Sequence, residues 1–231
     1  MTKFRLAAML VCFIAILTAN GRGASAACSS APAPGVDWSG CQKMRLIMEG
    51  EHLAGGTFNR TDLTATDLLG ANLQKAQFEY ANLTRVRLQK ADLRAANLSR
   101  AYGNHVNFSA ANLTGANLSK AEFSRADFSG ADLTNVDLSK SELGRARFTT
   151  AILKGVNFRK ANIARANLNG VTLQGSDLSG AFTLLTWVEG ADLSAAVGLN
   201  QQQLNDMCGN ETTKLPDGLS RPGNWPCAKG E

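Results

Sequence analysis

A five-residue period runs through most of this chain and restricts its fold more than any other feature. From Glu51 to Asn200 a leucine, phenylalanine or other aliphatic residue returns at nearly every fifth position, in one register and without insertion. The residue two before it is usually alanine, and the residue between them is mostly aspartate or asparagine. A helix has a period of 3.6 residues and a strand a period of 2. The pattern therefore predicts a repeat protein built from five-residue units.

Each unit can turn two side chains inward, the large central one and the small one two positions earlier. The second must be small because the interior is close-packed. A period of twenty places the centres in four columns, and one column is entirely leucine: Leu53, Leu73, Leu93, Leu113, Leu133, Leu153, Leu173 and Leu193. Another column collects Phe108, Phe128 and Phe148. Coils built from such units should stack about 4.8 Å apart, the spacing of paired strands, with Asn and Asp side chains bonding neighbouring turns.

The segments ANLTGANLSK, ADFSGADLTN and ADLRAANLSR carry the motif A(D/N)LxX. By these segments the chain resembles the pentapeptide-repeat family. The resemblance covers residues 51–200, and VDWSG at 36–40 extends the register with Trp38 as a centre. It implies an all-β fold, a right-handed quadrilateral parallel β-helix in which each side is one pentapeptide.

The first 26 residues have the features of a cleaved secretory signal peptide. Lys3 and Arg5 precede the uncharged run Leu6–Leu17, which is too short to span a bilayer as a helix, and Ala24–Ala26 offers a cleavage site. We therefore expect a periplasmic or secreted protein with no transmembrane segment in its mature form. A retained anchor and a lipid anchor at Cys28 are the alternatives.

Removal of residues 1–26 takes away Lys3, Arg5 and Arg22 and no acidic residue. The count of 24 basic residues falls to 21 against 19 acidic ones, a net charge of +2. A nearly neutral chain gives little electrostatic attraction for nucleic acid. We expect no nucleic-acid partner.

Four cysteines remain in the mature chain, and an even number in an exported protein indicates disulfides. Cys28 and Cys41 lie at one end of the repeats, and Cys208 and Cys227 at the other. We expect each pair to form one disulfide, because cross-pairing would have to bridge the whole tube.

The segments outside the repeats are expected to cover the two ends of the tube, since an open β-helix exposes unpaired edges. Residues 27–50 form an N-terminal cap and a first irregular coil, and residues 201–231 form a short helix and a disulfide-closed tail. Asn200 and Gln203 fit a capping box for that helix, and Gly209 is its expected end. The tail is also expected to cover apolar residues at outward positions of the last coil, namely Phe182, Leu184, Leu185, Trp187, Val197 and Leu199. A monomer is favoured, and a dimer through the C-terminal coils is the alternative.

Nothing in the sequence indicates an enzyme, a cofactor or a metal site. The two histidines, His52 and His105, fall on different sides of the tube, and no cysteine stays free once the disulfides form. The segment AYGNH at 101–105 places glycine where a large centre belongs. A local irregularity is the favoured interpretation, and a surface site of Tyr102, Asn104 and His105 is the other.

Basic residues gather at the position two past the centre, on two adjacent sides of the tube. One column runs Arg60, Tyr80, Arg100, Lys120, Lys140, Lys160, and the next runs Arg45, Ala65, Arg85, His105, Arg125, Arg145, Arg165. The candidate binding edge consists of Arg60, Arg100, Lys120, Lys140, Lys160, Arg85, Arg125, Arg145 and Arg165. A solvated charged face is the alternative, since acidic residues lie nearby.

Two functions from different classes follow. The first is a non-enzymatic structural or interaction scaffold of the bacterial cell envelope, whose partner is a protein or an anionic envelope component. The second, implied by the resemblance, is a gyrase-protecting DNA mimic. The near-neutral charge and the signal peptide disfavour the second.

Overall fold

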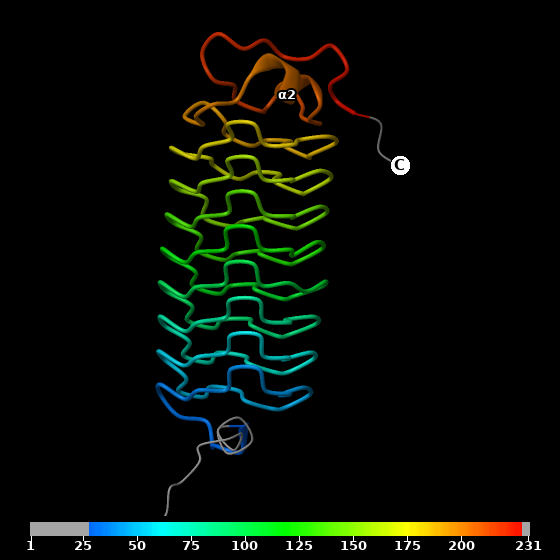
Figure 1. The fold of residues 1–231 in the computed structure, drawn as a ribbon. Helices are drawn as coiled ribbons and strands as arrows, with labels where there is room; N and C mark the ends of the chain where they lie inside the picture. Colours follow the sequence, from blue (N-terminus) through cyan, green and yellow to red (C-terminus); the bar gives the residue numbers. More distant parts are fainter. Residues whose placement is uncertain (1–27, 228–231) are drawn as a thin grey trace, which may run out of the picture.

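The computed structural model describes residues 28–227, which form a stack of similar coils with the helix α2 at its C-terminal end (Figure 1). Parallel bridges join residues twenty apart in the sequence. Four successive bridges, Asp37 to Thr57, Gln42 to Asp62, Ile47 to Asp67 and His52 to Asn72, complete one coil. The predicted coil of twenty residues with four sides is therefore confirmed. Its right-handed sense stays an expectation from the family.

Each side contributes a single bridged residue because a turn follows every centre. After Leu73, for example, the Ala76 N–H donates to the Leu73 carbonyl over 3.1 Å, closing a four-residue turn around Gln74 and Lys75. The second turn residue has a positive φ, +58° at Lys75. A type II turn requires this conformation at that position. The same left-handed residue recurs around the tube, and many corners fill it with glycine.

The interior holds the two inward side chains of each unit, as the sequence predicts. Leu113 and the other leucines of its column are buried. The phenylalanine column forms a ladder, in which the ring centroids of Phe108 and Phe128 lie 4.9 Å apart and those of Phe128 and Phe148 lie 5.0 Å apart. These rings are almost parallel. The coil spacing therefore places aromatic side chains at stacking distance.

The Asp or Asn of the motif acts mainly within its own turn. Its carboxylate or amide oxygen accepts the backbone N–H two residues on, as between Asp132 and Thr134 at 2.9 Å. Bonds between neighbouring coils, such as that from Asn157 to Asp137 at 2.9 Å, occur at fewer positions. The expected bonds between neighbouring coils are therefore the less frequent kind, and these residues chiefly shape the turn.

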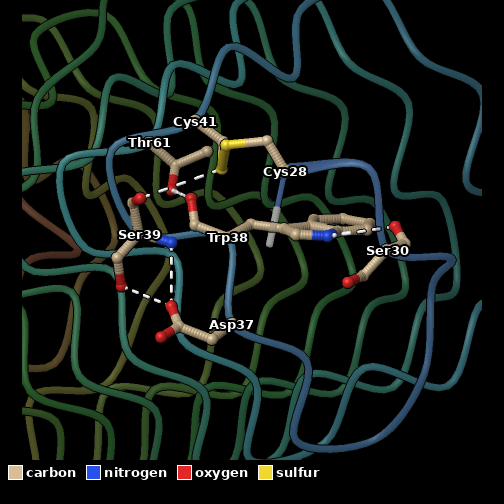
Figure 2. Close-up of a disulfide and its surroundings, with 7 residues drawn as sticks. All are labelled: Cys28, Ser30, Asp37, Trp38, Ser39, Cys41 and Thr61. Atoms are coloured by element: carbon tan, nitrogen blue, oxygen red, sulfur yellow. Dashed lines mark hydrogen bonds between the residues drawn. A yellow bond between two sulfur atoms is a disulfide. The ribbon is translucent and has the colours of Figure 1, made fainter. Parts of the chain in front are cut away.

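The N-terminal end is closed around Trp38 and the disulfide Cys28–Cys41 (Figure 2). Trp38 is buried, its indole N–H donates to the Ser30 carbonyl over 3.2 Å, and its own carbonyl accepts the Thr61 hydroxyl at 2.6 Å. The Lys43 ammonium lies 3.8 Å from the centre of the indole ring, and desolvation by burial lowers the pKa of that lysine. Because bridging begins at Asp37, the coil within residues 27–50 pairs as regularly as later ones.

At the C-terminal end the helix α2 spans Gln201–Asn205. The predicted capping box is confirmed, since Asn200 accepts the Gln203 N–H at 2.9 Å and the Gln203 side chain accepts the Asn200 N–H at 3.1 Å. The predicted end at Gly209 is wrong. The helix stops at Asn205 with Asp206 as C-cap, because the chain then turns to pair with the last coil.

The tail after α2 continues the parallel pairing. Cys208 bridges to Trp187, Lys214 bridges to Asp192, and the disulfide Cys208–Cys227 joins the tail to itself. The pairing predicted for all four cysteines is therefore present in the structure. Within residues 28–227 no helix is long and apolar enough to cross a membrane. The signal-peptide prediction for residues 1–26 lies outside the described residues.

The tail covers the end of the tube and not its sides. Leu204 and Met207 are buried against the last coil. Phe182, Leu184 and Val197 stay 52%, 43% and 54% exposed. The expectation that the tail covers all the outward apolar residues is therefore wrong. Those side chains point outward from the sides of the tube, whereas the tail continues the coil across its C-terminal end.

Candidate functional site

Two adjacent corners of the tube carry the basic columns. We call Arg60, Arg100, Lys120, Lys140 and Lys160 the lysine corner, and Arg85, His105, Arg125, Arg145 and Arg165 the arginine corner. One face of the tube lies between them, with Leu143 among its buried centres. The turn at each residue is locked to the next coil, as where the Arg125 N–H donates to the Gly144 carbonyl over 2.9 Å. Successive side chains of a corner therefore follow one another about 4.8 Å apart along the tube.

The arginine corner borders a groove of about 720 Å³. All five residues of the corner line it. The remaining lining residues come from the preceding position of each turn: Thr84, Asn104, Ser124, Gly144 and Ala164. These side chains are small, and none of the ten lining residues is acidic. The groove is therefore a shallow channel along the tube with guanidinium groups on one side.

The four arginines of this corner form no ion pair with any carboxylate in residues 28–227. Arginines elsewhere on the tube do, as in the contacts of Arg94 with Asp92 at 2.7 Å and of Arg159 with Asp177 at 3.0 Å. The difference concentrates unneutralised positive charge at the groove.

The arginines of this corner adopt a backbone conformation that is unfavourable for residues other than glycine. Arg85, Arg125 and Arg145 have φ values of +58°, +60° and +61°. An L-residue in this left-handed region costs roughly 1–2 kcal/mol relative to the right-handed one, and glycine avoids the penalty. No glycine occurs at this position from Arg45 to Leu185 on this corner, whereas the corner that follows has Gly50, Gly70, Gly130, Gly170 and Gly190. Turn formation alone does not explain the arginines.

The lysine corner differs from the arginine corner in its surroundings. The Tyr80 ring lies between Arg60 and Arg100, with centroid distances of 5.5 Å and 5.3 Å, and Arg100 also pairs with Glu79 at 3.1 Å. Lys120, Lys140 and Lys160 form no ion pair within the described residues and line none of the described cavities. The lysine corner is thus a charged edge whose first residues contact Tyr80 and Glu79.

The intervening face places acidic side chains between the two corners. Glu122 and Glu142 are exposed and line a second, smaller cavity of about 270 Å³ together with Tyr102. Asn104 and His105 line the arginine groove, and Tyr102 and Asn104 line the neighbouring cavity. The predicted set of Tyr102, Asn104 and His105 is therefore divided between two adjoining cavities that share Asn104.

The glycine in AYGNH has a packing role. A Cβ at Gly103 would lie 2.6 Å from the Leu83 carbonyl carbon and from the Thr84 nitrogen. At this point the backbones of neighbouring coils approach too closely for any side chain. The favoured interpretation of a local irregularity agrees with this geometry, and the close approach lies directly beneath the groove at Asn104.

The described residues contain no group of three His, Cys, Asp or Glu side chains that could hold a metal ion. His52 lies on another face and His105 in the arginine groove. The pKa values of Asp37, Asp92, Asp177 and Asp192 are lowered mainly by side-chain hydrogen bonds from Ser39, Arg94, Ser179 and Ser194, respectively. Each of these carboxylates accepts bonds within its own turn. They have structural roles.

The parallel pairing of twenty-residue coils places this protein in the class of solenoids, here one built from five-residue units with continuous side surfaces. Family models of pentapeptide repeats match residues 52–84 and 81–119, and a pentapeptide repeat region matches residues 102–178. The chain belongs to the pentapeptide-repeat family.

Solved structures of this family are similar to the chain. HetL from Nostoc sp. strain PCC 7120, described as involved in heterocyst differentiation regulation, shares 26% identity over 84% of this chain and 94% of its own, with a TM-score of 0.35. QnrB1, a plasmid-mediated fluoroquinolone resistance protein, shares 18% identity over 78% of this chain and 85% of its own, with a TM-score of 0.41. A pentapeptide repeat protein of the Arabidopsis thaliana thylakoid lumen shares 25% identity over 54% of this chain and 69% of its own, with a TM-score of 0.20. No curated protein matches the sequence.

Both basic columns were predicted from the sequence, but the groove and the difference in ion pairing between the two corners were not. A usable signal was present, because the position before each arginine holds Ser124, Gly144 and Ala164 on successive coils. A run of small residues beside a run of arginines indicates room next to the guanidinium groups. Whether an arginine forms an ion pair can depend on residues in other columns, as for Arg100 with Glu79, which the pattern of one column does not reveal.

Proposed function

We propose that this protein is a non-catalytic binding scaffold of the bacterial cell envelope that presents its arginine corner to an anionic partner. The observation that carries the proposal is a groove bordered by four arginines that form no ion pair within residues 28–227, in a column without glycine from Arg45 to Leu185. Selection for turn stability alone favours glycine at these positions.

The envelope location rests on the expected signal peptide, and the two disulfides of the structure suit an oxidising compartment. The tube has flat sides, and a disulfide-linked segment closes each of its ends. These features suit a rigid and monomeric scaffold. A DNA mimic needs an acidic surface to imitate phosphates. Two basic corners and a nearly neutral mature chain favour the scaffold.

Binding of the mature protein to polyanions at two ionic strengths tests the proposal. The probes are anionic vesicles, polyphosphate and polygalacturonate, each compared with a neutral vesicle or an uncharged glycan. We expect at least one polyanion to bind in preference to its neutral counterpart, with affinity that falls steeply as salt screens the exposed arginines. Equal binding of charged and neutral probes, or none at all, would overturn the proposal.

A further inference from the structure

We infer that the groove along the arginine corner binds a linear acidic polysaccharide with one carboxylate per sugar, lying parallel to the tube axis. The inference rests on the proposed function and assigns it a ligand class and an orientation. Three features of the groove carry the inference: the spacing of its charges, the chemistry of its lining and the acidic row beside it.

The spacing favours one anionic group per coil. Arg125, Arg145 and Arg165 stand on three successive coils, so their guanidinium groups repeat about every 4.8 Å. In a linear polyuronate one carboxylate follows each sugar ring, and one ring extends about as far as one coil. Arginine binds carboxylates through two parallel N–H···O bonds, so each carboxylate that faces the corner can engage one guanidinium.

The lining favours a sugar over a nucleobase. The groove holds no Phe, Tyr or Trp, whereas single-stranded nucleic acids are bound on aromatic side chains that stack with their bases. Ser124, Gly144 and Ala164 leave room beside the guanidinium groups. The side chains of Ser124 and Asn104 have no hydrogen-bond partner within residues 28–227 and can bond to hydroxyl groups of a sugar.

The acidic row disfavours denser or planar polyanions. Glu122 and Glu142 are exposed on the intervening face, one position beyond the groove. In polyphosphate neighbouring phosphates share an oxygen, so its charges lie closer together than the coils. The phosphates that find no guanidinium partner would therefore lie next to Glu122 and Glu142, with no cation to neutralise them. A flat anionic membrane spanning both basic corners would meet the same two carboxylates, and it cannot enter a groove.

Titration calorimetry with galacturonate oligomers of graded length tests the inference. We expect affinity to rise with chain length until an oligomer of about five residues covers the span from Arg85 to Arg165, and then to level off. Uncharged oligomers of the same lengths should not bind. An affinity that does not depend on length, or that keeps rising far beyond the groove, contradicts a single axial site.

Matched variants locate the site. Arg125→Gly with Arg145→Gly removes two charges from the groove, and Lys120→Gly with Lys140→Gly removes two charges from the lysine corner on the same part of the tube. All four positions have positive φ, so glycine suits the backbone in both variants and unfolding does not explain a loss. We expect the groove variant to bind the longest oligomer at least about tenfold more weakly, and the lysine-corner variant to bind it within about threefold of the parent.

The outcomes separate this inference from the proposed function. Equal losses in the two variants, or tighter binding of polyphosphate or of anionic vesicles than of the oligouronates, overturns the inference. If those other polyanions bind and the oligouronates do not, the proposed function stands without this ligand. If no polyanion binds, both are wrong.

Discussion

Trp225 lies directly over Gly209, at a point where no larger residue fits. A Cβ at Gly209 would overlap ring carbons of Trp225, and the indole N–H of Trp225 donates to the Met207 carbonyl over 2.6 Å. The ring thus holds the returning tail against the segment that follows α2, close to the disulfide of Cys227 with Cys208. Gly209 is needed for this packing and not as the end of the helix.

Gly209→Ala is expected to destabilise the protein by about 1–3 kcal/mol, because the methyl group forces the indole ring away. Chemical denaturation measures the change, and limited proteolysis shows whether the tail opens first. Gly223→Ala is the matched control, since a Cβ there meets nothing within 4 Å. Equal stability of the two variants would show that the ring moves without penalty.

The repeated part of the fold follows from the sequence to a degree that the ends do not. Every five-residue unit carries its own constraints, because a misplaced register would bury Asp and Asn and expose Leu. The tail has no such repetition. Its path depends on the contact of Trp225 with Gly209 and on the pairing of Lys214 with Asp192. No sequence pattern predicts these contacts.

The candidate site was predictable in part for the same reason. The columns containing Arg125 and Lys120 follow from the period alone. The difference between them arises from neighbouring columns: Gly144 and Ala164 make room beside one, while Tyr80 and Glu79 engage the start of the other. The groove forms between the column of arginines and the column of small residues before it, so it can be recognised only once the side chains of both columns are placed.

Gly103→Ala is expected to destabilise the protein by about 1–3 kcal/mol even though the repeat motif favours a large residue there. The added Cβ would meet backbone atoms of Leu83 and Thr84, which cannot rotate away as a side chain could. Gly144→Ala serves as control, because a Cβ there has contacts of 3.8 Å or more and no positive φ. Thermal unfolding that ranks Gly144→Ala as the more harmful change contradicts this packing.

Leu113→Ala is expected to lower the free energy of unfolding by about 2–5 kcal/mol. Leu113 is fully buried in the all-leucine column, and neighbouring coils cannot close the cavity without shifting the ladder. Ser119→Ala should change stability by less than about 0.5 kcal/mol, because this side chain lies at an outward position and accepts or donates no bond within the described residues. Urea denaturation of both variants checks the inward and outward assignment.

The ladder of parallel bridges from Asp37 to Val197 is interrupted once within the described residues, between Ile152 and Thr172. Neither the Leu153 N–H nor the Thr172 N–H has a hydrogen-bond partner there, and a cavity of about 350 Å³ opens beside them. Both amides should therefore exchange with solvent faster than that of Leu133, which donates to the Ile152 carbonyl over 2.9 Å in the coil before. Hydrogen exchange measured by NMR tests this; equal protection of all three amides would mean that the ladder closes in solution.

The pairing of the tail with the last coil should weaken in acid through Asp192. A hydrogen bond from the Ser194 hydroxyl, followed by one from the Lys214 ammonium at 2.9 Å, lowers the pKa of Asp192 to about 2. Because the folded value lies below the ordinary one, this contribution to stability is complete above about pH 4 and is lost as the pH falls through about 2.

We therefore expect exchange of the Lys214 amide, which donates to the Ala191 carbonyl over 2.9 Å, to accelerate over that pH interval relative to amides in mid-tube. Ser194→Ala should reduce this acid sensitivity more than Lys214→Gln, because the serine bond is the larger cause of the lowered pKa. Asp192→Asn should remove it, since the amide does not titrate. A Lys214 amide with the same acid dependence in Asp192→Asn as in the parent would assign the effect to another group.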